Sequence, residues 1–263
     1  MGHDLPAIRR KVSHDLGGRE LTRRTVAAAA VRLIGAAFFR VGSERYAREN
    51  GTFGLTTLRK SHVTIIGDRI QFEYKGKGSI EQRQVVFDRQ LARLLRRLMK
   101  TPGRRLFRYR ERGGWRDLTA PDVNEYLRLL APTPYTAKDF RTWGGTLRLA
   151  TVLGDIGAAN TAREATRNVA LAVRMVAAEL GNTPAICRAS YVHPLVIARY
   201  LDAGVTITPD EDRPQRVGRR GPTTAHTPEE RALLGFLDRY FPERRTRSVE
   251  RPRRERREEL LAA

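Results

Sequence analysis

The segment Leu180–Tyr191, LGNTPAICRASY, is the feature that most constrains the fold, because it ends one helix and starts another. Gly181 stands where a glycine in the left-handed conformation terminates a helix. Asn182 or Thr183 can cap the following helix, and Pro184 suits its first turn. The segment therefore predicts a long helix, a tight turn and a short helix that finishes on a tyrosine.

The short helix places Arg188 and Tyr191 three positions apart, and so on one face. A tyrosine hydroxyl near an arginine is a candidate nucleophile held beside an anion. A tyrosine at a helix end is also a common half-buried packing residue. The segment alone leaves both interpretations open.

The charge balance indicates an anionic partner. The chain of 263 residues has 50 Lys plus Arg against 29 Asp plus Glu, a net charge of +21. From Glu211 onward, 14 arginines face 10 acidic residues, so most of the excess lies on residues 1–210. A basic folded body, rather than a basic tail alone, predicts a shaped surface for nucleic acid.

Several classes of function lack support in the sequence. The single cysteine, Cys187, excludes a disulfide within the chain and a cysteine-based zinc site. The histidines show no metal-ligand spacing, and no GxxxxGKS loop is present, so we expect no metal, no nucleotide and no other cofactor. No apolar run approaches about 18 residues, and no signal peptide is visible, so we expect no membrane contact and a cytoplasmic location.

Hydrophobic periodicity predicts an α+β fold that is predominantly α, with one small three-stranded antiparallel sheet. The runs HVTII and RIQFEYKG, joined at Gly67-Asp68, predict a hairpin, and residues 81–87 a third strand. Residues 106–119, LFRYRERGGWRDLT, are predicted to be a connecting segment. Helices are predicted at these places: 4–16, 23–39 after the cap Thr22, 88–100, 120–130, from 137 after the cap Thr136, 161–180, from Pro194, and near 228–240. We expect a catalytic domain over 1–205, then a linker and mixed-charge tail over 206–263.

Five residues form a set with a common chemistry: Arg40, Lys77, Arg141, Asn182 and Tyr191. Two guanidiniums can neutralise a pentacoordinate phosphorane, and an amide can donate to a non-bridging oxygen. A lysine can protonate a leaving oxygen, and a tyrosine can attack and keep the strand as an ester. The plainer interpretations are a structural ion pair for Arg40 and a solubilising loop lysine for Lys77, which lies between two glycines.

Four stretches carry a resemblance to the catalytic domain of type IB DNA topoisomerases, of the small poxvirus-like kind also found in bacteria. FFRVGSERYARENGTFGLTTLRKSHV resembles the first block, with Arg40 at its catalytic arginine. FEYKGKG is similar to the hairpin block and holds Lys77, and KDFRTWG resembles the block of the second catalytic arginine, Arg141. LGNTPAICRASY resembles the nucleophile block, with Tyr191 as the attacking residue. The resemblance covers roughly residues 5–205.

The resemblance implies relaxation of supercoiled duplex DNA through a 3′-phosphotyrosyl intermediate, without metal or ATP, by a monomer associated with the nucleoid. It implies that Asn182 binds the scissile phosphate, where many relatives have histidine and the bacterial branch asparagine. It also implies DNA contacts by Tyr46 and Lys138, with Arg188 nearby.

Two further expectations concern the start of the chain and the alternatives. About 20 residues precede the second helix, so the family's N-terminal β-rich domain is expected to be missing, with weaker DNA binding and intact transesterification. A tyrosine recombinase would share the nucleophile chemistry, but it usually carries HxxR where this chain has Lys138 to Arg141. An inactive DNA-binding remnant would have the same charge.

Overall fold

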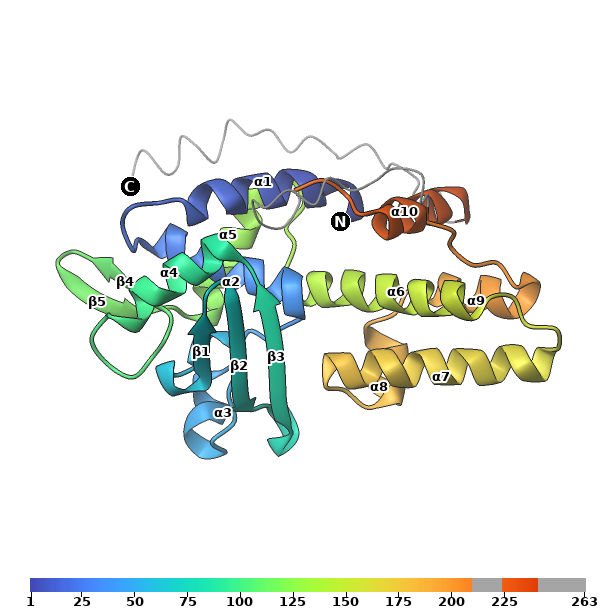
Figure 1. Ribbon diagram of the computed structural model, residues 1–263, viewed down its shortest axis with the longest axis horizontal. Coiled ribbons are helices and arrows are strands. Elements are labelled where there is room, and N and C mark those ends of the chain that lie inside the picture. The colour runs from blue at the N-terminus through green and yellow to red at the C-terminus, as the bar shows by residue number, and fades with distance from the viewer. Residues whose placement is uncertain (210–223, 241–263) are drawn as a thin grey trace, which may run out of the picture.

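The structure, a computed structural model, describes residues 1–209 and 224–240 and consists of two packed halves (Figure 1). One half surrounds the central helix α2 (Arg23–Ala37) and includes the sheet. The other is a stack of helices in which α6 (Ala137–Ile156) lies over α7 (Ala162–Leu180). Because α6 contributes Phe140 to the first core and Leu149 to the second, this helix joins the two halves.

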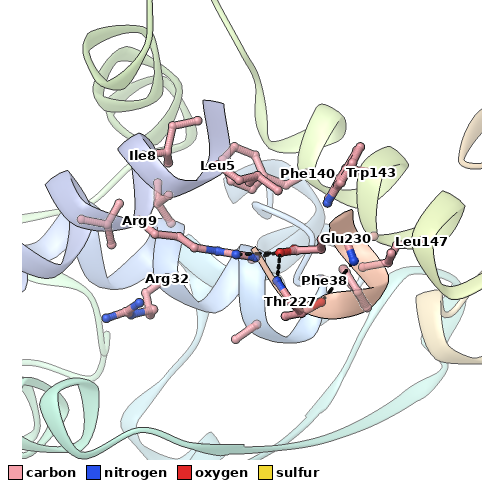
Figure 2. A pocket seen from close by; sticks show the side chains of 15 residues that line it. Leu5, Ile8, Arg9, Arg32, Phe38, Phe140, Trp143, Leu147, Thr227 and Glu230 are labelled. Atoms are coloured by element: carbon pink, nitrogen blue, oxygen red, sulfur yellow. Dashed lines mark hydrogen bonds and ion pairs between the residues drawn. The ribbon is translucent and has the colours of Figure 1, made fainter. Parts of the chain in front are cut away.

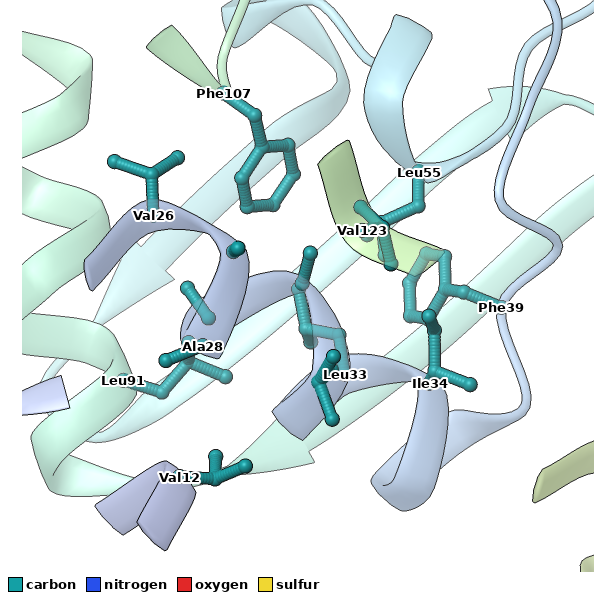
Figure 3. Packing of buried hydrophobic residues seen from close by; sticks show 14 of the residues in the cluster. Val12, Val26, Ala28, Leu33, Ile34, Phe39, Leu55, Leu91, Phe107 and Val123 are labelled. Carbon is teal, nitrogen blue, oxygen red and sulfur yellow. The ribbon is translucent and has the colours of Figure 1, made fainter. Parts of the chain in front are cut away.

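The first half packs helices around α2, whose alanine-rich middle is buried on all sides. Small side chains there let neighbouring elements approach closely. Figure 3 shows this core, where Leu33 and Ile34 of α2 lie among side chains of loops and of the surrounding helices. The helices of this half have these bounds: α1 Leu5–Leu16, α3 Glu44–Glu49, α4 Arg89–Met99 and α5 Ala120–Leu130.

The three-stranded antiparallel sheet has the order β1-β2-β3, with β1 Val63–Ile66, β2 Arg69–Lys75 and β3 Glu81–Phe87. Its pairing brings Tyr74 opposite Gln82 at the end nearest the β2–β3 turn. Alternation buries Ile70, Phe72 and Tyr74 on one face of β2. These strands and the α+β class, predominantly helical, confirm the sequence prediction.

The predicted connecting segment, residues 106–119, contains a second hairpin. Strands β4 (Arg108–Glu111) and β5 (Gly114–Asp117) pair antiparallel across a turn in which Arg112 and Gly113 both have positive φ. The sequence prediction of a single sheet is therefore incomplete. Strands β4 and β5 are only four residues long, which is too short for an alternating pattern of apolar and polar residues to be recognised.

The second half stacks α6 and α7 with α8 (Pro184–Ser190) and α9 (Pro194–Ala203). The predicted helices of both halves are confirmed, with small shifts at their ends. The helix after Thr22 ends at Ala37, because Phe38 takes the left-handed conformation with φ of 54°. Ile207 is buried in the second core, so ordered packing continues past residue 205.

Helix α10 (Pro228–Tyr240) packs back on both halves instead of extending as a tail. Glu230 is buried and accepts two hydrogen bonds from Arg9 of α1, at 2.6 and 2.8 Å. Figure 2 shows this pair at the wall of an apolar cavity of about 250 Å³, which reaches Phe38 and Trp143. The expected linker and tail fall mostly in 210–223 and 241–263, outside the described residues.

Candidate active site

The turn after α7 has the geometry that its sequence predicts. Gly181 adopts φ of 61°, and its amide and that of Asn182 bond to carbonyls of the last turn of α7. Of the two candidate caps, Thr183 is the one that accepts from the amide of Ile186. The turn therefore reverses the chain so that α8 delivers Tyr191, at its C-terminal end, back beside α6.

Two glycines of α6 set how closely the nucleophile segment approaches. A Cβ on Gly145 would lie 2.5 Å from the carbonyl oxygen of Tyr191, and one on Gly144 would lie 1.8 Å from the ring of Phe38. Thr146 extends the contact, since its hydroxyl accepts from the amide of His193 at 3.0 Å. None of these residues was predicted from the sequence. A signal was there, since adjacent glycines within a helix cost about 1 kcal/mol each and need a packing reason.

The loop that carries Arg40 is tied to the segment before the sheet. The carbonyls of Arg40 and Val41 accept from the amides of Leu55 and Thr56 at 2.8 and 2.7 Å. Gly54 packs so closely that an added Cβ would lie 2.5 Å from the Gly42 Cα. These contacts hold the Arg40 backbone against the first core and leave its guanidinium to face the second half.

Arg40 contacts the turn of the nucleophile segment across the junction of the two halves. Its Nη2 donates to the Gly181 carbonyl and to Asn182 Oδ1, both at 2.6 Å. No carboxylate among residues 1–209 and 224–240 forms an ion pair with it. The alternative of a structural ion pair therefore finds no partner in the described chain, and the positive charge stays available to an anion.

Arg141 is 4% exposed and lies between Arg40 and Tyr191. Its guanidinium donates to the carbonyls of Phe38 and Leu180 and lies 5.0 Å from the centre of the Tyr191 ring. Burial lowers the pKa of Arg141, the charge of Arg40 lowers it further, and Tyr191 acts in the opposite direction. Two like charges held together in a buried site favour the binding of an anion.

Lys77 reaches the same place from the sheet. It lies in the 3-10 turn Lys77–Ser79 between β2 and β3, and Gly78 there has φ of 74°. A small recess is lined by Lys77 together with Arg40 and Arg141. A neighbouring groove of about 390 Å³ shares Arg40 and Lys77 and extends to the exposed ring of Tyr46.

Tyr74 also lines the recess but differs from Tyr191 in its environment. It is 6% exposed, and burial raises the pKa of Tyr74 to about 12, while a hydrogen bond with Gln84 and the two arginines act in the opposite direction. Its hydroxyl therefore stays protonated at neutral pH. Tyr74 can therefore donate a hydrogen bond in the recess. Tyr191 differs in that it is only half-buried and lies at the end of the short helix α8.

Two donors in the site have no partner among the described residues. Arg141 Nε and Asn182 Nδ2 are both buried and make no hydrogen bond there. A buried donor without an acceptor costs about 1–3 kcal/mol. Their position beside Arg40 and Tyr191 fits an anion whose oxygens complete these bonds.

The five residues of the predicted set thus come together, and the three predicted DNA contacts lie around them. Tyr46 lines the groove. Lys138 is exposed on the first turn of α6, one turn before Arg141, and Arg188 is exposed on α8, one turn before Tyr191. Both therefore lie on elements that also carry a residue of the set.

No group of three or more His, Cys, Asp or Glu in residues 1–209 and 224–240 is arranged to hold a metal ion. No described helix is long and apolar enough to cross a membrane. Cys187 is fully buried, and burial raises the pKa of its thiol.

The fold and the site define a helical core in which a half-buried tyrosine lies beside a cluster of basic groups, of which Arg141 is buried, Arg40 half-buried and Lys77 exposed. The sequence model of the family described as eukaryotic DNA topoisomerase I, catalytic core, matches residues 1–208. The chain belongs to this family, which confirms the resemblance and decides against a tyrosine recombinase.

Viral proteins are among its similar relatives. The chain is 28% identical over 204 residues to DNA topoisomerase 1B of Acanthamoeba polyphaga mimivirus, an alignment covering 74% of this chain and 61% of the relative. It is 26% identical over 171 residues to DNA topoisomerase 1B of vaccinia virus (strain Copenhagen), covering 63% of this chain and 50% of the relative. DNA topoisomerase I of monkeypox virus gives the same identity and coverage. The chain therefore spans about half to three fifths of the length of these relatives.

Proposed function

We propose that the chain relaxes supercoiled duplex DNA by cutting and resealing one strand through Tyr191. The observation that carries this proposal is the convergence of two arginines, an amide and a tyrosine, with unpaired buried donors between them. Membership of the topoisomerase I family and the names of the viral relatives support it.

In the proposed step, Tyr191 Oη attacks the phosphorus and the bond from phosphorus to O5′ breaks. The phenol releases its proton to solvent water as the new bond forms, and Lys77 gives its proton to the departing O5′ and is later reprotonated from solvent. The strand is kept as a 3′-phosphotyrosyl ester. Religation reverses both transfers, and the ester bond conserves the energy it needs.

The arginines and the asparagine stabilise the transition state. Arg40 and Arg141 neutralise the charge that develops on the non-bridging oxygens, in a site where buried donors act more strongly than in water. Asn182, already oriented by Arg40 through its Oδ1, presents its unpaired Nδ2 to a phosphate oxygen. Asparagine donates hydrogen bonds without carrying charge, so the two guanidiniums supply the positive charge.

The surroundings of the site support duplex DNA as the substrate. The groove from Arg40 to Tyr46 continues the recess outward, and Lys138 and Arg188 add exposed charge at two further edges. We propose that these groups contact phosphates and so position the duplex rather than read its sequence. We further infer that the protein acts as a monomer, needs neither metal nor nucleotide, and works on nucleoid DNA in the cytoplasm.

The test is relaxation of negatively and positively supercoiled plasmid in EDTA without ATP, with covalent adduct trapped by detergent. The wild type is compared with Tyr191→Phe and with Tyr240→Phe, a tyrosine control at the end of α10 and outside the site and the groove. The proposal is supported if the wild type and the control relax plasmids of both supercoil signs and form the adduct, while Tyr191→Phe loses both activities. If the wild type binds plasmid but forms no adduct, the chain is a binding remnant and the proposal fails.

A further inference from the structure

The outer face of α7 carries a row of basic side chains that points at the site. Arg163, Arg167 and Arg174 are all exposed. On a helix of 3.6 residues per turn they lie within about 40° of one another, and position 181 continues the same line. The opposite side of α7 is the apolar one that packs in the second core. The row therefore leads along the helix to the turn whose carbonyl contacts Arg40.

The charge of this row is not neutralised by the described part of the protein. None of the three arginines forms an ion pair with a residue of the described ranges. The two acidic residues of α7 are engaged elsewhere: Glu164 accepts from the amide of Asn160, and Glu179 pairs with Arg148 of α6 at 2.8 Å. Three exposed guanidiniums on one line, with no ion-pair partner among these residues, complement a regularly spaced polyanion.

We propose that this row, the α7 track, binds the phosphate backbone of one arm of the duplex outside the cleavage site. This inference rests on the proposed function, since it takes its direction from the site at Gly181. With a rise of about 1.5 Å per residue, the track spans about 10 to 27 Å from Gly181. At about 3.4 Å of duplex per base pair, this corresponds to about three to eight base pairs from the scissile phosphate.

The structure also provides a matched control. Arg10 of α1, Arg93 of α4 and Arg128 of α5 are exposed and form no ion pair with described residues. Their helices lie on the side of the molecule away from α7 (Figure 1). Replacing these three arginines with glutamine removes the same charge without touching the track.

The first experiment measures binding of a 30-base-pair duplex of arbitrary sequence by fluorescence anisotropy as salt is varied. All proteins carry Tyr191→Phe, so covalent chemistry does not contribute. Each phosphate that the protein no longer neutralises reduces the slope of log K against log salt by about 0.9. The variant Arg163→Gln/Arg167→Gln/Arg174→Gln should therefore lose about 2–3 from the slope and bind at least about tenfold more weakly in 0.1 M salt. The control variant, with Arg10, Arg93 and Arg128 replaced by glutamine, should lose less than about one from the slope of log K against log salt. A variant with the three track arginines replaced by lysine should keep the wild-type slope.

The second experiment locates the effect on the duplex. A cleavage site is first mapped with the wild type, and duplexes are then built around it. On each side in turn, the arm has either about three or about twelve base pairs. The track variant should lose the extra affinity of the longer arm on one side only. Equal slopes in track and control variants, or an equal effect on both arms, would overturn the α7 track. If the wild type with Tyr191 intact forms no adduct, while the slopes of the track and control variants still differ, the proposed function fails and the α7 track stands.

Discussion

Replacing Gly145 with alanine is the sharpest test of how α6 positions the nucleophile. An added Cβ would lie 2.5 Å from the Tyr191 carbonyl oxygen and 3.2 Å from Leu180 Cδ1. Since ordinary contacts begin near 3.4 Å, the Tyr191 backbone must retreat by about 0.9 Å. The nearest atom belongs to the backbone, so no side-chain rotation relieves the clash.

The retreat should affect catalysis more than stability. A displacement of about 1 Å can reduce a rate about 100-fold, because the attacking oxygen no longer lies in line with the leaving group. Crowding of this kind typically costs about 1–3 kcal/mol of folding free energy. Since Arg141 is held by the carbonyls of Phe38 and Leu180, it should stay in place while Tyr191 moves.

The assay is single-turnover cleavage of a duplex, with adduct quantified on a denaturing gel, alongside thermal unfolding. Gly235→Ala is the control, because Gly235 is an exposed helical residue whose added Cβ meets nothing within 4 Å. Cleavage by Gly145→Ala should fall about 100-fold with DNA affinity unchanged. A wild-type rate in a variant that unfolds at the wild-type temperature would refute the role given to this glycine.

Three further outcomes are expected. Lys77→Ala should slow cleavage about 100-fold or more, and a substrate with sulfur at the 5′ bridging position should restore the rate, since a thiolate leaves without a proton; no rescue would remove Lys77 from the role of acid. Glu230→Gln should lower the free energy of unfolding by about 2–4 kcal/mol, because Arg9 loses its buried partner. Burial raises the pKa of Glu230, but hydrogen bonding and charge from Arg9 outweigh it and hold the pKa below its usual 4.5. The stabilisation by Glu230 should therefore be present above pH 4.5 and be lost as the pH falls further. In acid titrations of stability, the glutamine variant should lack this dependence. Thr183→Ala should cost about 0.5–2 kcal/mol in chemical denaturation, because the amide of Ile186 loses its cap, and Thr183→Ser should restore it.

Much of the fold could be predicted from the sequence, because its elements depend on near neighbours. The cap Thr22, the turn at Gly67 and the glycine at 181 act through local backbone geometry, and each appears as predicted. The hairpin at β4–β5 was missed because it is too short for a periodic signal. The choice between Thr183 and Asn182 as the cap was also open, because either side chain can accept a hydrogen bond from a backbone amide in the first turn of the next helix.

The candidate site shows where sequence reasoning ends. Residue types and the family resemblance predicted a site of Arg40, Lys77, Arg141, Asn182 and Tyr191. They did not reveal that Arg40 donates to the turn 141 residues away, or that Arg141 is braced by two backbone carbonyls. The need for glycine at positions 144 and 145 is explained only by the tertiary structure, in which Phe38 and the Tyr191 backbone pack where a Cβ would lie.

By itself, the sequence determined the helices, the three-stranded sheet and the basic character, because these follow from local propensity and composition; the set of reactive groups stays a prediction that rests on residue types and the family resemblance. Only the tertiary structure decided which groups meet. It placed Asn182 to be oriented by Arg40, left two buried donors without partners among the described residues, and folded α10 back onto α1. These arrangements arise from packing between segments far apart in the chain, which no local pattern of residues records.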